Sequence, residues 1–524
     1  LSLHDALPIW STSDGRFVVK LKTPTAAEAK GPQWFSVAWD GGETRVSDVL
    51  IGEVWVCGGQ SNMEWPVSAS DGAKETIAGA NDGQIRLFTV ENVMSLTPRA
   101  DNTGSWSAAH PQSVAGFSAV GYAFAREIRR EVGVPVGLIS CDWGGTRAEA
   151  WMSAGALSAF PEMKERLELV RMSRDPNERG QVTERARAAW WDGLDQRGPK
   201  VGAEWPKAEF DDSSWKVMGL PASLGPEGLD RFDGVVYFRV AVELPAEAAG
   251  KAGVLSLGAI DDRDDAWVNG VRVGSTREDG KWSVSRRYEV PAGVLRAGRN
   301  VVAVRMLDTA GLGGINGKAE EMSLTPAGMK GVSLAREWRY LKGAAMGELP
   351  GIPETPQMNP AATVTGLYNG MVATIAPMTP RGVLWYQGES NRDEHALYGR
   401  LFKGLIADWR GAFGVEGMPF YFVQLAPFRY VGNTEWLARV REGQASALEL
   451  PGTGMVVTTD IGNVADIHPR NKAEVGRRLS LWALADTYGK AGVVKSGPIA
   501  KQVSFGGGSA RVSFDHVGSG LVAR

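Results

Sequence analysis

The sequence has little cysteine, no excess of either charge and no long apolar run. Its two cysteines, Cys57 and Cys141, are too few for a disulfide framework or a cysteine-rich metal site. Cys57 also lies inside an apolar run, where thiols are normally inert. Lys and Arg total 57 and Asp and Glu total 60, a net charge of −3, so the basic face that nucleic acids and anionic membranes select is not expected. No uninterrupted apolar stretch reaches the roughly 20 residues that cross a bilayer. We therefore expect neither a nucleic-acid partner nor a membrane span.

The common cofactor motifs are absent as well. The sequence contains no C-x-x-C, no H-E-x-x-H, no P-loop and no G-x-G-x-x-G, the spacings by which zinc, phosphate and dinucleotide sites are recognised. An acidic stretch at 261–265 is similar to a calcium loop, but Ala266 stands where an EF-hand has glycine. We predict a solvated β-turn there, no metal and no cofactor.

The sequence does have ample length and an ordinary globular composition. Its residues are 43% hydrophobic and 22% charged, which excludes large-scale disorder. A length of 524 residues exceeds one ordinary domain, so two or more folded units are expected. The counts of 66 Gly and 19 Trp predict many turns and many flat apolar surfaces.

Both ends of the chain have patterns typical of partial β segments. Apolar and polar residues alternate within 1–48, once over 17–21 and again over 35–39. The first ten residues carry Asp5 and no basic residue before it, which is not a signal-peptide pattern, so we expect a fragment boundary there. Residues 493–524 alternate around a Gly-rich turn, which predicts a β-hairpin of a domain whose remainder is missing.

The segment 49–192 has the pattern of an α/β domain. Residues 54–57 form a continuous apolar run that ends in two glycines, typical of a buried parallel strand that enters a tight turn. Residues 117–132 have the spacing of an amphipathic helix. A second buried strand at 136–140 is followed by another Gly-Gly pair. This alternation of strand, glycine turn and helix predicts an α/β sheet.

Residues 193–332 change to a β pattern, and residues 333–492 return to α/β. The middle segment consists of short alternating runs separated by turn signals such as Asn269-Gly270, which predicts a β-sandwich. The later segment supplies further strands and a helix, at 372–375, 383–386, 420–423, 455–457 and 472–487. One α/β domain is therefore predicted, split by an inserted β domain.

Ser61 is the first candidate catalytic residue. It follows the predicted strand at 54–57 in the segment VWVCGGQSNMEWP, and ligands of open α/β sheets bind at the carboxyl ends of such strands. A helix that begins there directs backbone N–H groups toward negative charge that forms beside the hydroxyl. The pattern Gly59-x-Ser61-x-Met63 lacks the last glycine of a G-x-S-x-G elbow. This segment alone fits a serine that merely caps a helix equally well.

A serine nucleophile needs a base, and the chain has only five histidines. Two of them lie in the end segments, and His110 and His395 lie in polar or helical surroundings that favour a solvated ring. His468 instead lies in a loop between a predicted strand and a predicted helix, two residues after Asp466. A carboxylate at that spacing can orient an imidazole and stabilise its charged form. A surface loop with a chance ion pair is the alternative.

Other strand ends carry possible hydrogen-bond donors for an oxyanion. Gly145 follows the second predicted strand and allows a substrate to approach its N–H closely. Gln387 and Asn391 follow a later strand and carry side-chain amides. A glycine after a strand is usually only a turn. Together with Ser61 and His468, however, these donors complete the set that acyl transfer requires.

Five segments of the chain resemble one known family. GGQSNMEWPV, GLISCDWGGTRAEAWM, LYNGMVATIAP, GVLWYQGESN and DIHPRNKAEVGRRL are similar to the sialate O-acetylesterase group of SGNH (GDSL-type) hydrolases. The resemblance covers most of both α/β segments, in the right order. It implies an SGNH three-layer α/β/α sandwich with a parallel sheet, and a serine esterase that releases acetate from acetylated sugars.

The inserted segment has a resemblance of its own. The stretch from FDDSSWKVMGLP to GAIDDRDDAWVNGVRVG is similar to the galactose-binding-like jelly roll of bacterial relatives and of β-galactosidases. This resemblance implies an all-β jelly-roll domain at 193–332. Sugar binding and a role as lid or spacer are equally open for it, because fold analogy does not assign a function.

Matched motif by motif, the family resemblance implies roles for single residues. Ser61 would be the nucleophile and His468 the general base. The N–H groups of Ser61 and Gly145 would form the oxyanion hole, with Gln387 or Asn391 as a third donor. The same motifs supply the candidate substrate-binding residues Gln60, Asn62, Met63, Arg147 and Glu389.

The acid that orients the histidine departs from the superfamily pattern D-x-x-H. That pattern requires aspartate where the sequence has Ala465. Asp466 could still reach the ring, Asp460 could take its place, or the serine and histidine could work as a dyad. The family's Gly-x-Asn-Asp block is also altered, to QGESN at 387–391, which leaves the third oxyanion donor open.

These motifs predict a carbohydrate O-acetylesterase, with 9-O-acetylated sialic acid as the first candidate substrate. An esterase for acetylated plant polysaccharide such as xylan is the alternative among enzymes. A non-catalytic carbohydrate-binding protein, suggested by the β insert and the tryptophans, is the alternative outside them. Relatives with this architecture are typically exported, so the resemblance implies a periplasmic or secreted location. The oligomeric state is not predicted.

Overall fold

The computed structural model describes residues 24–26, 28–29, 31–197, 201–225, 229, 232–278, 280–353, 358–430 and 435–521. The chain divides into two compact units. The first is built from Leu1–Pro176 with Gln357–Arg524, and the second, Asn177–Pro356, is inserted between these two stretches in sequence. The domain boundaries at 193 and 332 stay predictions.

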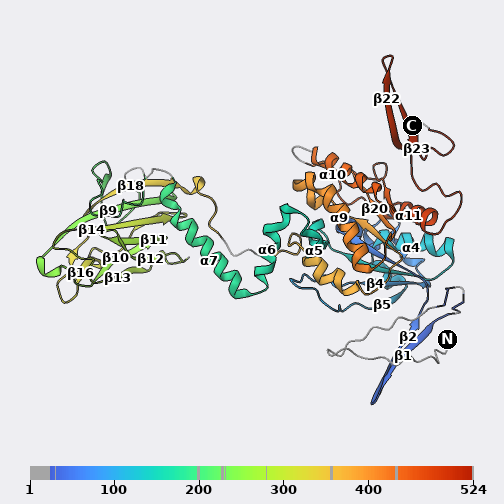
Figure 1. The fold of residues 1–524 in the computed structure, drawn as a ribbon, viewed down its shortest axis with the longest axis horizontal. Helices are drawn as coiled ribbons and strands as arrows, with labels where there is room; N and C mark the ends of the chain where they lie inside the picture. The colour runs from blue at the N-terminus through green and yellow to red at the C-terminus, as the bar shows by residue number, and fades with distance from the viewer. Residues whose placement is uncertain are drawn as a thin grey trace. The chain divides into compact units, whose positions relative to one another are not determined.

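A seven-stranded sheet forms the centre of the first unit (Figure 1). Its strands are β3 (Glu53–Gly59), β4 (Asp82–Thr89), β5 (Trp106–Ala109), β6 (Val136–Asp142), β19 (Gly382–Tyr386), β20 (Phe420–Val423) and β21 (Thr453–Val456). They follow the spatial order β21-β20-β19-β3-β6-β4-β5, and every neighbouring pair is parallel except β4 with β5. The strands predicted from continuous apolar runs at 54–57, 136–140, 383–386, 420–423 and 455–457 are confirmed, because such runs suit a sheet that is buried on both faces.

Helices cover both faces of this sheet. The helices of one face are α4 (Ala119–Val132) and α11 (Lys472–Trp482), and those of the other are α9 (His395–Phe413) and α10 (Glu435–Ser446). Neighbouring residues of one strand point to opposite faces, so Trp55 packs with α4 and α11 whereas Val56 packs with α9. Shorter helices are α1 (Ser61–Glu64), α2 (Ala73–Ala78), α3 (Pro111–Ala115), α5 (Ala154–Leu157) and α6 (Lys164–Ser173). Of the helices described, none is both long and apolar enough to cross a membrane.

The bounds of α4 follow from local signals. The Ser118 hydroxyl accepts a hydrogen bond from the Gly121 N–H at 3.1 Å, and Gly133, with a φ of 79°, ends the helix. The helix predicted at 117–132 is confirmed, with a start two residues later. The helix predicted at 472–487 is also confirmed, as α11 followed by a π-helical turn.

One predicted strand of the first unit is wrong. Residues 372–375 are helical: they end a π-helical turn, Tyr368–Val372, and form α8 (Ala373–Ile375). The run is short, apolar and β-branched, and a run of this kind occurs both in buried strands and in buried helices. Val372 and Ile375 are buried in the same core as α9, so the apolar pattern reports burial and not strand geometry.

Two antiparallel sheets pack face to face in the second unit. One contains β8 (Ala222–Ser223), β10 (Gly253–Asp261), β13 (Ser285–Val290), β15 (Gly314–Ile315), β16 (Met322–Pro326) and β17 (Val332–Ser333). The other contains β7 (Lys216–Gly219), β9 (Gly234–Leu244), β11 (Arg263–Val268), β12 (Val271–Thr276), β14 (Gly298–Asp308) and β18 (Glu337–Ala345). Alternate residues such as Val236 and Phe238 of β9 enter the apolar core between the sheets. The predicted turn at Asn269-Gly270 joins β11 to β12 with φ of 51° and 84°, and the predicted β pattern is confirmed.

An aromatic layer covers the outer face of the sheet that contains β9. The helix α7 (Pro176–Asp192) contributes Trp190 and Trp191, which are both buried. Trp205 packs edge-on against Tyr237 of β9, with ring centroids 5.0 Å apart. These tryptophans therefore fill a core and do not form a flat surface for a sugar.

The acidic stretch 261–265 differs from the solvated turn that the sequence predicts. Asp264 and Asp265 have no exposed surface. Arg286 donates to Asp264 at 2.7 Å, and Arg305 donates to Asp265 at 2.6 Å. These arginines come from β13 and β14, far away in sequence, and their charges allow the carboxylates to be buried. Within the described part of the chain, no three metal-ligating side chains are grouped as a metal site.

Two hairpins lie toward the ends of the described chain (Figure 1). β1 (Gln33–Trp39) pairs antiparallel with β2 (Gly42–Val49), and β22 (Ile499–Gly506) pairs antiparallel with β23 (Ser509–Asp515). The β segments predicted here from alternating apolar residues are confirmed. The earlier alternating run at 17–21 lies outside the described residues.

Candidate active site

Ser61 lies at the turn where β3 passes into α1. This turn requires glycine: Gly59 has a φ of 138°, and a Cβ there would lie 2.2 Å from the carbonyl oxygen of Tyr386 on the neighbouring strand. The N–H of Gln60 donates to the same oxygen at 2.9 Å. Ser61 is therefore fixed at the carboxyl end of the sheet, where its side chain is half-buried.

The Ser61 hydroxyl contacts the imidazole of His468. Its Oγ lies 2.9 Å from Nε2 of His468, which belongs to the loop between β21 and α11. Gln60, and not Ser61, occupies the N-cap of α1, so the interpretation of the serine as a capping residue is wrong. Because α1 has only four residues, its dipole is small. The contact with His468 is what distinguishes this serine.

Stacking and burial set the properties of His468. The indole of Trp65 stacks on its ring, with centroids 4.8 Å apart and planes 20° from parallel. Burial and the nearby Lys472 lower the pKa of His468 below its ordinary value of 6.5, against the opposing charge of Asp466. The imidazole is therefore neutral at neutral pH and can accept a proton.

Two aspartates are candidates for the acid that orients His468. Asp466 accepts the backbone N–H of His468 at 2.9 Å, so its carboxylate lies beside the histidine, although this bond does not involve the ring. Asp460 is bound instead by Arg478, at 2.7 and 2.6 Å. The fold thus brings Asp466 to the histidine and ties Asp460 to α11.

The loop after β6 approaches Ser61 closely. A Cβ at Gly144 would lie 3.3 Å from the Cβ of Ser61, and the Gly144 N–H donates to Glu64 at 2.7 Å. Gly145 is exposed, with a φ of 73°, and its N–H makes no hydrogen bond to any residue that the structure describes. The Ser61 N–H, in the first turn of α1, has no acceptor within the helix. Two backbone donors are therefore available for an oxyanion at this strand end.

Gln387 and Asn391 are completely buried and bonded to the protein. The side-chain nitrogen of Gln387 donates to the carbonyl of Thr146 at 3.1 Å and to Oδ1 of Asn391 at 2.7 Å. The side-chain nitrogen of Asn391 donates to Glu149 at 2.8 Å. Both amide hydrogens of Gln387 are thus engaged in joining the loops after β6 and β19. A third oxyanion donor from either residue stays a prediction.

Arg147, a candidate substrate-binding residue, is surrounded by carboxylates. Its guanidinium lies 2.7 Å from Glu149, 3.1 Å from Asp393 and 2.9 Å from Glu394. Glu149 is completely buried and also accepts from Arg166 at 2.8 Å. Arg147 therefore holds the loop after β6 against the segment after β19, and its charge is neutralised.

The remaining substrate-binding candidates lie inside the protein. Asn62 and Met63 have no exposed surface, and Gln60 and Glu389 are 3% and 7% exposed. Oε1 of Gln60 accepts the N–H of Gly388 at 3.3 Å. Their burial leaves these four side chains little surface for a ligand, and their contact with a sugar stays a prediction. They build the interior of the site.

Trp65, Glu64 and Lys472 were not predicted as site residues. Trp65 is the C-cap of α1, four residues after Ser61, and this spacing of one helical turn is the signal that points to it. Lys472 is only 1% exposed, and burial lowers its pKa to about 7. No feature of the sequence predicts that a lysine at the start of a helix is buried. No feature of the sequence points to Glu64 either.

Cys57, His110 and His395, the other residues that could act as nucleophile or base, have structural roles. His110 caps α3, where its Nδ1 accepts the Ser113 N–H at 3.4 Å. The Nδ1 of His395 bonds the carbonyl of Arg392 at 2.9 Å. Cys57 is completely buried, and burial raises the pKa of its thiol well above the ordinary value. These contacts fit the structural interpretation of all three.

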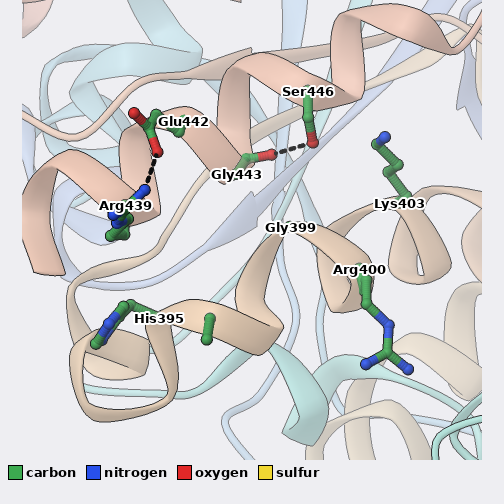
Figure 2. Close-up of a pocket in the computed structure, with 9 residues that line it drawn as sticks. His395, Gly399, Arg400, Lys403, Arg439, Glu442, Gly443 and Ser446 are labelled. Atoms are coloured by element: carbon green, nitrogen blue, oxygen red, sulfur yellow. Dashed lines mark hydrogen bonds and ion pairs between the residues drawn. The ribbon is translucent and has the colours of Figure 1, made fainter.

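A separate pocket of about 510 Å³ lies between α9 and α10 (Figure 2). Its three cations, Arg400, Lys403 and Arg439, each pair with a carboxylate within 3.3 Å. Neither Ser61 nor His468 lines it. The pocket therefore offers neutralised charges and no nucleophile, and the strand-end site is the better candidate for chemistry.

Most of the first unit matches a known family. The sequence model described as carbohydrate esterase, sialic acid-specific acetylesterase, matches residues 51–176 and 316–484. These two stretches make up more than half of the chain and contain both Ser61 and His468.

Curated relatives match over shorter stretches. The protein of Mus musculus named sialate O-acetylesterase is 35% identical over 169 residues, which are 28% of this chain and 31% of the relative. The Homo sapiens protein of the same name is 33% identical over 178 residues, 29% of this chain and 34% of the relative. The matched stretch thus spans about a third of the length of these relatives.

A solved structure is similar over nearly the whole chain. A carbohydrate acetylesterase from Xanthomonas citri superposes with a TM-score of 0.51 at 26% identity, over 92% of this chain and 66% of that protein. The mixed α/β architecture with several sheets is consistent with the fold of that enzyme.

Proposed function

The chain belongs to the sialic acid-specific acetylesterase family of carbohydrate esterases, and on that premise we propose that it hydrolyses O-acetyl esters of carbohydrates. One observation carries the proposal: Oγ of Ser61 and Nε2 of His468 are 2.9 Å apart. A hydroxyl in contact with a neutral imidazole is the arrangement by which serine esterases activate their nucleophile. The relatives that bear the name sialate O-acetylesterase support acetyl esters as the substrate class.

In the first half of the reaction, Ser61 attacks the carbonyl carbon of the acetyl group. As the bond from Oγ to carbon forms, Nε2 of His468 accepts the hydroxyl proton. The lowered pKa of His468 supports this role, because the imidazole is then neutral before the attack. The imidazolium next gives its proton to the sugar oxygen as the ester bond breaks. The sugar leaves, and Ser61 is acetylated.

In the second half, water releases acetate from the acetylated serine. His468 accepts a proton from the water as it attacks, and the imidazolium returns that proton to Oγ of Ser61. Negative charge forms on the carbonyl oxygen in both halves. The N–H groups of Ser61 and Gly145 are the donors that we assign to it, and loss of one such donor typically costs about 10²- to 10³-fold in rate. Gln387 could act as a third donor only after one of its present hydrogen bonds breaks.

Asp466 is the acid that we assign to His468. Its carboxylate bonds the backbone N–H of the histidine at 2.9 Å, and its charge favours the imidazolium. Asp460 is a weaker candidate, because Arg478 already binds both of its oxygens.

The fold type and the cellular location are part of the same proposal. We assign the first unit to the SGNH type, a three-layer α/β/α sandwich, on the grounds that helices cover both faces of its mainly parallel sheet. The two packed sheets of the second unit support an inserted jelly roll of the galactose-binding-like kind. A periplasmic or secreted location follows from the family resemblance.

The charges around Arg147 bear on the choice of sugar. Sialic acid carries a carboxylate, which an unpaired arginine binds well. Arg147 is already paired with three carboxylates, at Glu149, Asp393 and Glu394, so this group does not attract a further negative charge. This pairing of Arg147 favours a sugar without charge. Acetylated xylan is therefore a second candidate substrate beside 9-O-acetylated sialic acid.

Acetate release tests the proposal. The wild-type chain and a Ser61→Ala variant are compared on 9-O-acetylated sialic acid, acetylated xylan and a simple aryl acetate. We expect the wild type to release acetate from at least one sugar ester and the variant to release none above background. Binding of a sugar without acetate release from any ester would overturn the proposal and identify a non-catalytic carbohydrate-binding protein.

A further inference from the structure

Lys472 is a buried lysine beside the Ser61–His468 pair. It is the first residue of α11, four residues after His468, and only 1% of its surface is exposed. Its Nζ donates a hydrogen bond to Oδ1 of Asn62, the residue that follows Ser61. Burial of an ammonium group is costly unless the charge is paired. A lysine that only covers the surface would not be found here.

Asn62 links the two chain segments that carry the reacting groups. Its Oδ1 accepts from Lys472, and its Nδ2 donates to Glu389 at 2.8 Å and to the carbonyl of Ile467 at 3.0 Å. Both amide hydrogens are engaged, which fixes the orientation of the amide. Asn62 is the chain neighbour of the hydroxyl, and Ile467 is the chain neighbour of the imidazole. The amide therefore ties one segment directly to the other.

Two acids and two aromatic rings surround the Lys472 amine. Glu389, 7% exposed, is the opposite charge across the bridging amide, and its Oε2 has no hydrogen-bond partner among the residues described. Asp466 is the second acid that acts on the amine. The rings of Tyr386 and Trp65 have their centroids 5.5 and 5.8 Å from Nζ. Burial raises the pKa of Glu389 and lowers that of Lys472, so each group depends on the other for its charge.

We infer, on the basis of the proposed esterase function, that Lys472 is a positioning residue for the Ser61–His468 pair, acting through the amide of Asn62 with Glu389 as its opposite charge. Lys472 does not bond the hydroxyl or the imidazole. It fixes the amide that joins their two segments, and in its protonated form it places a positive charge beside the base.

The positive charge has a predictable effect on the base. Lys472 is, after burial, the strongest influence that lowers the pKa of His468, and Asp466 opposes it. Loss of the charge raises this pKa, so the imidazolium persists to higher pH and cannot accept the Ser61 proton. The acid limb of the pH profile therefore moves to higher pH when Lys472 is replaced by a neutral residue.

The reaction of Ser61 with a fluorophosphonate probe tests the inference without a sugar substrate. The probe phosphonylates an activated serine with loss of fluoride, and its rate reports on the hydroxyl and imidazole directly. The main variant combines Lys472→Met with Glu389→Gln, which removes both charges and leaves neither buried alone. Arg477→Met is the matched control, because it removes a positive charge from an exposed position of the same helix.

We expect the double variant to label about 10- to 100-fold more slowly than the wild type, as a displaced reacting group does, with the midpoint of its pH profile at higher pH. Lys472→Arg keeps the charge and should return that midpoint toward the wild-type value, and Arg477→Met should label normally. A wild-type rate and midpoint in the double variant would overturn the inference. Asn62→Ala removes the bridging amide but keeps both charges. It serves where the double variant does not fold: slower labelling supports the inference, and unchanged labelling overturns it.

Failure of the esterase proposal has a different signature. If Ser61 is not the nucleophile, Ser61→Ala is labelled as fast as the wild type. If the esterase proposal holds and the inference is wrong, Ser61→Ala abolishes labelling while the Lys472 variants label normally.

Discussion

Two buried charge pairs, one in each unit of the chain, are arranged in different ways. In the second unit, Arg286 bonds Asp264 directly at 2.7 Å, and the carboxylate has no exposed surface. In the first unit, Lys472 and Glu389 are joined only through the amide of Asn62. The direct pair connects β13 to β11, and so one sheet of the sandwich to the other. In the indirect pair, the amide that lies between the two charges also bonds the loop that carries the imidazole. The pair in the second unit therefore serves stability, whereas the pair in the first unit serves the placement of reacting groups.

The architecture of each unit explains this difference. The parallel strands of the first unit end at one edge of the sheet, so loops far apart in sequence converge there and stay accessible to ligands. The antiparallel sheets of the second unit enclose their core between two faces. A charge inside that sandwich has no access to a substrate, and its partners are structural: Asp264 accepts from Arg286 and from the Tyr288 hydroxyl.

The Ser61→Ala variant has the largest expected effect, and it tests whether ester hydrolysis depends on the first unit alone. We expect the rate of acetate release to fall by about 10⁴-fold or more, because the nucleophile is lost. Acetate release is measured with a simple aryl acetate, and thermal unfolding serves as the control for an intact fold. Residual activity near that of the wild type would break the comparison, since a second catalytic group would then exist elsewhere.

Asp264→Ala tests the other side of the comparison. Removal of this carboxylate leaves the Arg286 charge buried with backbone carbonyls but without an opposite charge, so the free energy of unfolding should fall by about 3–5 kcal/mol. Urea unfolding of the full chain measures the loss, and acetate release per folded molecule should not change. The double variant Asp264→Leu with Arg286→Met is the control, because it removes both charges and should recover most of the stability. A loss of activity without a loss of stability would contradict the structural role.

Substitution of two aspartates that are close in sequence should show which of them orients His468. Asp466→Ala should slow turnover by about 10²-fold or more, because the imidazolium loses its neighbouring charge. Asp460→Ala removes only a surface ion pair with Arg478 and should change turnover and stability little. Steady-state kinetics of both variants on one ester decide the order. The reverse order would transfer the orienting role to Asp460.

Local chemistry made much of the first unit predictable from sequence. Continuous apolar runs that end in glycines identified the buried parallel strands, since few other structures need that pattern. Ser61 and His468 stood out because each follows a predicted strand and because histidine is scarce. Their 2.9 Å contact could be expected from the convergence of parallel strand ends, but only coordinates give the distance.

The errors have two physical causes: partners that are distant in sequence, and a short apolar run that fits both a strand and a helix. Asp264 and Asp265 are buried because arginines from β13 and β14 neutralise them. No pattern near these aspartates in the sequence predicts those arginines. Residues 372–375 are helical because a short apolar run does not state its own backbone geometry. The burial of Lys472 depends likewise on Asn62 and Glu389, which belong to two other loops. A local sequence pattern shows which residue types follow one another, but it does not show which distant residues pack against them.

The pH dependence of the esterase reports the environment of His468. Burial and Lys472 lower the pKa of this residue below 6.5, so the neutral imidazole is retained as the pH falls past that value. Activity is lost only at lower pH, where the ring binds a proton and can no longer accept one from Ser61. We expect the acid limb of kcat/KM to have its midpoint below pH 6.5. A midpoint above 6.5 would mean that a neighbouring acid outweighs burial and the lysine.

Glu64 extends the comparison of charged groups to a single carboxylate, which positions a backbone donor. It accepts the Gly144 N–H at 2.7 Å, next to the Gly145 N–H that we assign to the oxyanion. Glu64→Gln keeps the size and an acceptor oxygen but loses the charge, which weakens the bond by about 1 kcal/mol. We expect kcat to fall about fivefold with KM unchanged, since the loop contacts the oxyanion and not the bound ester. Glu75→Gln, at an exposed position of α2, is the control. A raised KM with an unchanged kcat would instead assign Glu64 to substrate binding, and the carboxylate would then belong to the surface of the site and not to its framework.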